Sequence, residues 1–209
     1  MGLAQLINDQ PDLVVCDEAG DAASALETLK ENGANLVLSE IALPDKSGLE
    51  LIRDIKAMRP GLPVLVISMH DESLYAERAL HAGARGYIMK DATGEQLMDA
   101  IRQVLSGKMY VSKKISSHVV EAFSGGSSAS STRLSVEQLS AREFQVFELI
   151  GLGLSTSKIA RRLSLSVKTV NAHRVQIKKK LHIKTAPELI SFAARWLTSR
   201  GGEDRAGQH

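Results

Sequence analysis

The chain has 209 residues, of which 44% are hydrophobic, 24% are charged and 4% are aromatic, a composition typical of a globular protein with one or two domains. It contains no apolar run of the ~18 residues that a membrane span needs, and its first residues lack the pattern of a secretory signal, so we expect a cytoplasmic protein with no membrane partner. Its one cysteine, Cys16, excludes an intrachain disulfide, and we expect a small buried apolar residue there.

Charge divides the chain into two parts. Residues 1–123 hold 12 Lys+Arg and 18 Asp+Glu, a net charge of −6, whereas residues 124–209 hold 14 and 6, a net charge of +8. The sign changes at residues 124–132, a run of Ser, Gly and Ala that ends in Thr and is typical of a flexible linker. The basic part either meets a polyanion or carries a basic surface without a partner. We predict a first domain at 1–110, a linker at 111–133, a second domain at 134–200 and a disordered tail at 201–209.

The first part of the chain alternates short apolar runs with amphipathic stretches. The apolar runs predict strands at 13–16, 36–39, 64–68 and 86–89. The stretches between them predict helices near 22–32, 48–58, 73–82 and 93–106. A β-α repeat of this spacing indicates a parallel sheet covered by helices on both faces. The ligand edge of such a sheet lies at the carboxyl ends of its strands. The sequence places four candidate site residues there: Glu40, Ser68, Tyr87 and Lys90.

The second part is helical by pattern. Ser140 and Glu143 form a capping box for a helix that ends at Gly153, and Ser155 caps a short helix at 156–163. Ser166 caps a longer helix at 167–181, and a last helix covers about 187–197. A short helix, a turn of about three residues and a longer basic helix are typical of a helix-turn-helix that enters the DNA major groove.

A helical projection of residues 167–181 separates an apolar face from a polar one. Val170, Ile177 and Leu181 fall on one face and are expected to pack inward. The opposite face carries Lys168, Asn171, Ala172, Val175 and Lys179. Short side chains allow close approach to DNA, an amide can read a base edge, and cations can meet phosphates. The alternative is a solvated charged face.

Four segments of the second part carry a family resemblance: 139–143, 155–160, 166–174 and 180–181. They resemble the LuxR-type helix-turn-helix of the NarL/FixJ response regulators. The resemblance implies binding to double-stranded DNA through Lys168, Thr169, Asn171, Ala172, His173, Arg174, Val175 and Lys178. His173 lies on the flank of the helix, where packing and a phosphate contact remain open. Lys158 departs from the family, which often has Glu there.

The last predicted helix carries an apolar stripe. In the family the matching helix forms the dimer contact on DNA, so the resemblance implies a homodimer through Leu189, Ala193 and Trp196. Two recognition helices on two half-sites raise affinity through effective concentration.

The first part of the chain resembles a CheY-like receiver, on residues 36–44, 47–48, 64–70 and 83–90. The resemblance implies an α/β flavodoxin-like fold. In the family an Asp at a strand end accepts phosphate from a histidine kinase, with Mg²⁺ held by an acidic pair. A Lys steadies the phosphate, and a Ser/Thr and an aromatic residue relay the change. Ser68, Tyr87 and Lys90 match these last three roles.

Two departures from the receiver family matter. The phosphoacceptor position is Glu40, one methylene longer than Asp, so its carboxylate overshoots the geometry of phosphoryl transfer. Glu40 either imitates the phosphorylated state beside Lys90 or marks a decayed site with a plain ion pair. Residues 2–8 match the first family helix, so we expect the strand before it, and its acidic pair, to be missing. Its absence would leave a gap in the centre of the sheet, which reflects either a shortened reading frame or a remnant receiver. Without the acidic pair we expect no Mg²⁺ site and no cofactor, and Asp17, Glu18 and Asp45 are not assigned to metal.

The sequence therefore predicts a DNA-binding transcription regulator of two-component type that works without phosphorylation. Glu40 argues against a histidine kinase as phosphate donor. The alternative is a protein-interaction regulator that acts by titration through a degenerate receiver. An enzyme is disfavoured because the chain has no G-x-S-x-G motif, no phosphate-binding loop and no His cluster with metal-ligand spacing.

Overall fold

The computed structural model describes residues 2–31, 33–112, 115, 136 and 138–203. The chain divides into two compact units, residues 1–126 and 127–209. Of the predicted linker at 111–133, only residues 111, 112 and 115 are described, so its Ser/Gly-rich run at 124–132 lies outside the described residues, as do residues 204–209 of the predicted tail.

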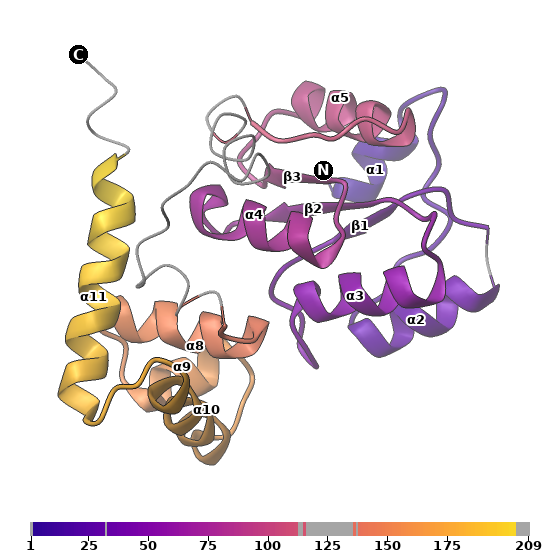
Figure 1. Ribbon diagram of the computed structural model, residues 1–209. Helices are drawn as coiled ribbons and strands as arrows, with labels where there is room; N and C mark the ends of the chain where they lie inside the picture. The colour runs from indigo at the N-terminus through magenta and orange to yellow at the C-terminus, as the bar shows by residue number, and fades with distance from the viewer. Residues whose placement is uncertain (1, 32, 113–114, 116–135, 137, 204–209) are drawn as a thin grey trace. The chain divides into compact units, whose positions relative to one another are not determined.

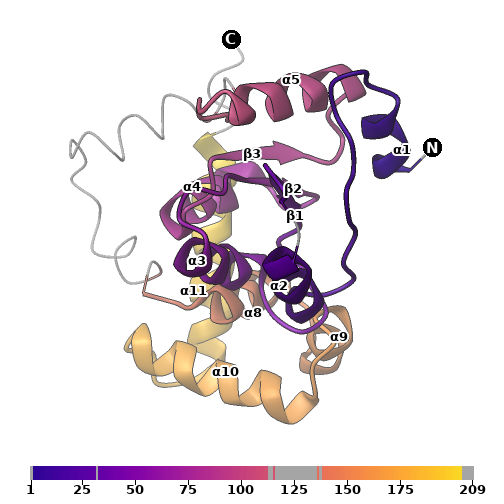
Figure 2. The same ribbon diagram turned by 90° about the vertical axis from the view of Figure 1, so that its right-hand side faces the viewer.

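The first unit is a parallel sheet between two layers of helices. Its strands run in the order β1-β2-β3, where β1 is Val37–Ser39, β2 is Val64–Ser68 and β3 is Gly86–Met89. The helices are α1 (Leu3–Asn8), α2 (Ala22–Glu31), α3 (Gly48–Met58), α4 (Glu72–Ala82) and α5 (Gly94–Leu105). Helices α1 and α5 cover one face of the sheet, and α2, α3 and α4 cover the other (Figures 1 and 2). This arrangement confirms the predicted α/β class.

Local sequence explains where these elements begin and end. Every residue of β2 is buried, as expected for a strand covered on both faces. Ser47 and Thr93 form capping boxes that start α3 and α5, and the Asp71 side chain accepts the backbone N–H of Ser73 to start α4. Helix α4 ends at Gly83, whose φ of 108° is a left-handed conformation that glycine adopts without a Cβ clash.

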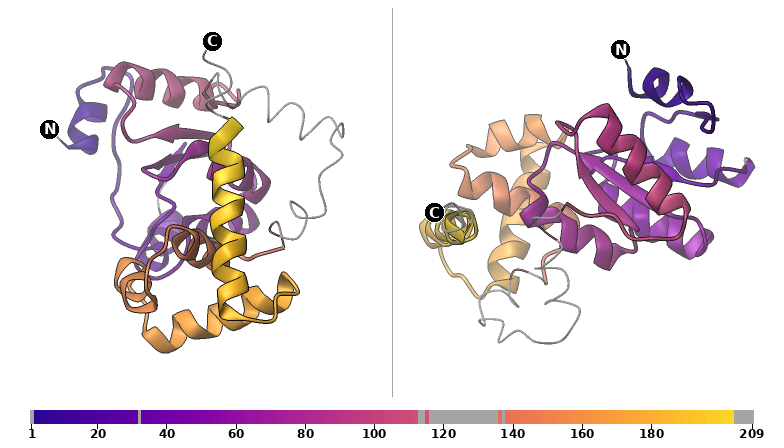
Figure 3. Two further views of the ribbon diagram at one scale, coloured as in Figure 1. Left: turned by 90° about the vertical axis from the view of Figure 1, so that its left-hand side faces the viewer. Right: turned by 90° about the horizontal axis from the view of Figure 1, so that it is seen from above.

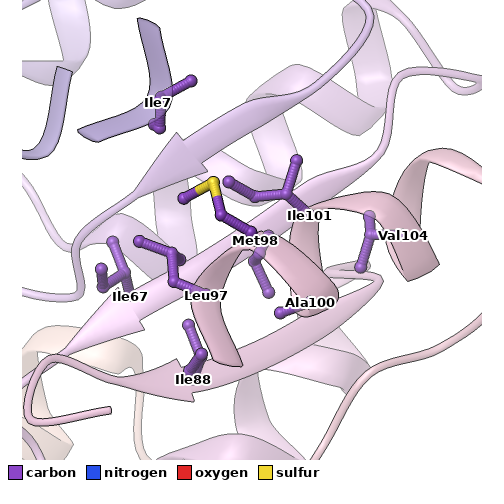
Figure 4. Packing of buried hydrophobic residues seen from close by; sticks show 9 residues of the cluster. Ile7, Ile67, Ile88, Leu97, Met98, Ala100, Ile101 and Val104 are labelled. Atoms are coloured by element: carbon purple, nitrogen blue, oxygen red, sulfur yellow. The ribbon is translucent and has the colours of Figure 1, made fainter. Parts of the chain in front are cut away.

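The core on one face of the sheet is built mainly by α5. Leu97, Met98 and Ile101 of this helix point toward the sheet, where Ile67 and Ile88 meet them (Figure 4). Ile7 of α1 joins the same buried cluster. Helix α1 is therefore held by apolar burial on α5 and the sheet.

The predicted strand at 13–16 is wrong, because these residues form no ladder with any described strand. The backbone N–H of Val15 donates instead to Oδ1 of Asn8 at 2.7 Å. Arg102 of α5 fixes the preceding turn through two 2.8 Å hydrogen bonds to the Asp12 carboxylate. In the predicted flavodoxin-like sheet, residues 13–16 would pair with a central strand that lies between them and β1. Among the described residues β1 pairs only with β2. Without that neighbour the segment stays irregular, and Cys16, expected to be buried, is exposed.

The second unit is all-helical in its described part. It contains α8 (Ala141–Gly151), α9 (Thr156–Arg162), α10 (Val167–Lys180) and α11 (Ala186–Glu203). Figure 3 shows α11 as the long yellow helix. It packs along α8, where Trp196 meets Phe144 and Phe147 with ring centroids 5.6 Å apart in both pairs. Helix α11 runs past the predicted end at residue 197, so residues 201–203, assigned to the disordered tail, are helical.

No helix in the described ranges combines the length and the apolar character that crossing a membrane requires.

Candidate functional site

Three of the four predicted receiver residues lie at the carboxyl edge of the sheet, whereas Tyr87 is the second residue of β3. Glu40 follows β1, Ser68 ends β2 and Lys90 follows β3. The Lys90 backbone N–H donates to the Ser68 carbonyl at 2.9 Å, which brings these strand ends together. The Lys90 ammonium forms a close ion pair with the Glu40 carboxylate, and both side chains are partly exposed. The edge thus holds a carboxylate already neutralised by a cation.

The loop that carries Glu40 is held in place by a glycine. A Cβ built on Gly48 would lie 1.8 Å from the Glu40 carbonyl oxygen, so only glycine fits against this backbone. The Gly48 N–H also donates to the Ile41 carbonyl at 2.8 Å. The first turn of α3 therefore fixes the position of the Glu40 backbone.

Ser68 and Tyr87 are both tied to the backbone of His70. The Ser68 hydroxyl accepts the His70 N–H at 3.0 Å, and the Tyr87 hydroxyl donates to the His70 carbonyl at 2.8 Å. Both side chains are buried. The His70 ring lies 4.8 Å from the ring of Tyr75 in α4, so the two predicted switch residues are linked to that helix through His70.

Asp45, in the loop between β1 and α3, caps a helix rather than binding a cation. The Asp45 carboxylate accepts the backbone N–H groups of Ala22 and Ala23, both at 3.0 Å, and so caps α2 from more than twenty residues away. Burial would raise the pKa of Asp45, but these backbone hydrogen bonds hold that pKa below its ordinary value.

The residues present at the edge do not fit the Mg²⁺ that the receiver resemblance implies. The Glu40 carboxylate is paired with Lys90 and the Asp45 carboxylate caps α2. Across the described ranges, no three His, Cys, Asp or Glu side chains are grouped so that they could hold a metal ion. A hard cation of this kind needs several oxygen ligands, which this edge does not offer.

In the second unit, three serines begin the predicted helices in turn. The side chains of Ser140, Ser155 and Ser166 accept N–H groups in the first turns of α8, α9 and α10. The turn between α9 and α10 passes through Ser164, whose φ is 54°. Val170 and Ile177 are fully buried and orient α10 on the rest of the unit, as the projection predicted.

The last turn of α10 is anchored by an ion pair. Lys180 donates to Oε2 of Glu143 at 2.6 Å and to the Gln138 carbonyl at 3.3 Å. Burial would raise the pKa of Glu143, but the hydrogen bonds from Lys180 and from the Ser140 N–H outweigh it and lower that pKa. Lys180 thereby positions α10 rather than standing free on its surface.

The structure divides the predicted DNA-facing residues into two groups. The exposed members are Lys168, Asn171, Ala172 and Val175. The half-buried members are Thr169, His173, Arg174 and Lys178. Thr169 takes part in the Ser166 cap through a 2.8 Å hydroxyl contact. The projection missed Gln176, which is exposed; its position four residues after Ala172 was the available signal.

The sequence of α9 and α10 carries charges of a single sign. Between Glu148 and Glu188 the sequence contains nine Lys and Arg residues and no Asp or Glu. Three of the nine, Lys158, Arg161 and Arg162, are exposed on α9. This concentration of cations on a helix-turn-helix is suited to a phosphate backbone.

The three residues predicted for the dimer contact lie in the core of the second unit. Leu189 and Ala193 have no exposed surface and Trp196 retains 8%. They face α8, because an apolar stripe on a helix satisfies the domain's own core first. The exposed residues of α11 include Ile190 and Arg195 instead.

Comparisons with known proteins agree with this two-unit arrangement. The family model of the response regulator receiver domain matches residues 1–102, and that of the luxR family of bacterial regulatory proteins matches residues 137–193. The oxygen regulatory protein NreC of Staphylococcus carnosus is 34% identical over 197 residues, which cover 93% of this chain and 91% of NreC. NreC of Staphylococcus aureus gives the same identity and coverage.

Solved structures show the same fold. A LuxR-family two-component response regulator from Aurantimonas is 30% identical with a TM-score of 0.53, over 58% of this chain and 86% of that one. RcsB from Salmonella enterica, solved bound to the promoter rprA with the phosphomimetic BeF₃⁻, is 22% identical with a TM-score of 0.55, over 91% of this chain and 90% of RcsB.

A receiver-type sheet followed by a basic helix-turn-helix defines a two-component response regulator with a DNA-binding domain of the LuxR type. The chain belongs to the NarL/FixJ family of these regulators, as its identity to the NreC proteins over nearly their whole length shows.

Proposed function

We propose that this response regulator binds double-stranded DNA through α10 and controls transcription without prior phosphorylation. The observation that carries the proposal is the ion pair between Glu40 and Lys90 at the carboxyl edge of the sheet. Glu40 holds the family's phosphoacceptor position, and Lys90 matches the Lys that steadies the phosphate. A negative group is thus already in contact with that cation.

Phosphoryl transfer to this site is disfavoured on three grounds. The Glu40 carboxylate is one methylene longer than Asp, it is occupied by Lys90, and the described residues offer no ligand set for Mg²⁺. Phosphoryl transfer depends almost entirely on positioning and on charge neutralisation by the metal. A histidine kinase therefore has no suitable acceptor here.

The ion pair can bias the receiver only modestly. Both side chains are partly exposed, and pairs of this kind contribute about 0.2–1 kcal/mol. That free energy corresponds to a shift of roughly fivefold at most between two conformations. We therefore expect Glu40 to raise DNA affinity modestly rather than to be required for DNA binding.

The DNA side of the proposal rests on α9 and α10. Their exposed cations supply affinity for phosphates, and the exposed residues of α10 supply base contacts. We further propose a homodimer through the exposed face of α11 around Ile190, so that two copies of α10 meet half-sites about one helical turn apart. RcsB, which shares this fold, has been solved bound to promoter DNA.

The test is DNA selection from a random pool with the full chain, followed by titration of the selected site with and without acetyl phosphate and Mg²⁺. We expect the same affinity in both conditions. Glu40→Gln should weaken binding by up to about fivefold, whereas Glu95→Gln, which removes an exposed carboxylate on α5, should not.

Two outcomes would overturn the proposal. A rise in affinity with acetyl phosphate would show that the site still accepts phosphate. Binding by residues 134–209 but not by the full chain would show that the receiver inhibits, which would favour the alternative of a regulator that acts by titration.

A further inference from the structure

The exposed side of α10 combines amides, short apolar side chains and lysines. Its exposed residues are two amides, three short apolar side chains and two lysines: Asn171, Gln176, Val167, Ala172, Val175, Lys168 and Lys179. None of these seven is an arginine or a carboxylate. Their role in reading bases rests on the proposed binding of α10 in the major groove.

The one arginine of α10 is engaged inside the unit. Nη1 of Arg174 donates to Oγ1 of Thr156 at 2.8 Å, and the side chain is half-buried between α10 and α9. An arginine fork reads guanine by placing two donors on O6 and N7 at once. Since the Arg174 fork is held by the first turn of α9, the exposed face lacks the side chain most often used for guanine.

The two lysines sit at opposite ends of the exposed face. Lys168 lies in the first turn of α10 and Lys179 in the last. Each is a compact charge on a flexible stem, which suits a phosphate contact at the rim of the groove. The residues between them are therefore the ones placed to meet base edges.

Those central residues match the two groups that A·T pairs display in the major groove. The amide of Asn171 can donate to N7 and accept from N6 of adenine at the same time, which is the bidentate adenine contact, and Gln176 carries the same group. Val175, 57% exposed, and Ala172 present methyl groups, which contact the 5-methyl of thymine. Neither an amide nor a methyl group recognises guanine as well as an arginine fork does.

The spacing limits how far apart these contacts fall. Asn171 and Val175 are four residues apart on one face, a rise of about 6 Å along the helix. Successive base pairs are about 3.4 Å apart. The two side chains therefore address base pairs one or two steps apart.

We infer that the operator half-site of this protein has A·T pairs at its centre, read as adenine by Asn171 and as thymine methyl by Val175. Ala172 and Gln176 extend the same reading to adjacent pairs. The ligand class is thus a double-stranded site whose core is recognised through thymine methyl groups.

The experiment uses the full chain and its selected site, with each thymidine of the half-site replaced in turn by deoxyuridine. This exchange removes only the 5-methyl group. For the wild-type protein we expect one or two positions at which affinity falls about three- to fivefold, the value of one buried methyl group.

Val175→Ala supplies the decisive comparison. It should lower affinity for the thymidine site and abolish the penalty for deoxyuridine at one position. Val14→Ala, which shortens an exposed valine outside the helix-turn-helix, should keep every penalty. Deoxyuridine penalties unchanged in Val175→Ala would overturn the assignment to Val175.

The inference and the proposed function fail in different ways. A selected half-site with only G·C pairs at its centre would overturn the inference and leave DNA binding intact. Failure of the full chain to select any sequence would overturn both.

Discussion

Lys180, in the last turn of α10, places its ammonium 2.6 Å from the carboxylate of Glu143, in the first turn of α8. The Glu143 side chain is only 8% exposed, so its charge depends on this partner. Glu143 also closes the capping box by accepting the Ser140 N–H at 2.7 Å. One carboxylate thus joins the start of α8 to the end of α10.

Glu143→Gln should destabilise the second unit by about 2 kcal/mol, because it leaves Lys180 without its anion and weakens the capping box. Trp196 is the only tryptophan of the chain and lies in this unit, so its fluorescence follows the unfolding of this unit within the full protein. Glu188→Gln, in the first turn of α11, is the control, and it should destabilise the unit less because Glu188 is exposed. Equal effects of both changes would contradict the special role of Glu143.

The same pair predicts a pH dependence. The pKa of Glu143 is lowered in the folded state from its ordinary value of 4.5, so the stabilisation is fully present above about pH 5. It is lost as the pH falls through the lower pKa of the folded state, because a protonated Glu143 no longer binds Lys180. Urea unfolding followed by Trp196 fluorescence from pH 7 to pH 3 measures this loss. In Glu143→Gln the slope below pH 5 should be smaller than in the wild type.

Asn171→Ala should relax sequence preference by about 1–3 kcal/mol at a single base pair, because it removes an exposed amide proposed to read adenine. Binding is measured on the selected operator and on a random duplex of equal length. The loss should be confined to the operator. An equal loss on both duplexes would show that Asn171 does not read a base.

Lys178→Ala should weaken binding to every duplex and reduce the salt dependence by about one charge, because a phosphate contact releases a counterion. Titrations between low and moderate salt give the slope of affinity against salt. Lys108→Ala removes an exposed lysine of the receiver unit and provides the control. If the two variants share the wild-type slope, Lys178 makes no phosphate contact.

Gly151→Ala should destabilise the second unit by about 1–3 kcal/mol, since a Cβ there would lie 2.6 Å from Cδ1 of Leu197 and 2.8 Å from the Ala193 carbonyl oxygen. The backbone of α11 cannot yield as a flexible side chain would. Thermal unfolding followed by Trp196 fluorescence measures the effect. Leu152→Ala, at an exposed neighbouring position, should change stability by no more than about 0.5 kcal/mol.

Elements with strong local signals were predictable from the sequence. Strand β2 and helix α3 have the predicted bounds, because a continuous apolar run and a Ser47 capping box mark them within their own residues. Residues 13–16 also form an apolar run, yet a strand needs a hydrogen-bonding neighbour that no local pattern reveals. The predicted sheet was therefore correct in class and wrong in its first predicted strand, residues 13–16.

In the candidate site, too, features that depend on local sequence were predictable and contacts between distant residues were not. The helical projection separated buried Val170 and Ile177 from exposed Asn171 and Val175, because that separation depends only on the period of the helix. The bond from Arg174 to Thr156 joins residues on two different helices and could not be predicted from spacing. For α11 the apolar stripe was identified, but a stripe does not say whether it faces its own domain or a second copy, and Trp196 faces its own.

The cap that Asp45 places on α2 makes two backbone amides sensitive to the conformation of the loop between β1 and α3. Because its carboxylate holds the amide hydrogens of Ala22 and Ala23, these two hydrogens are protected only while the loop between β1 and α3 keeps its present conformation. That loop begins at Glu40. The rate at which the Ala22 and Ala23 amides exchange with solvent deuterium would therefore reveal any rearrangement around Glu40, in solution and without a label.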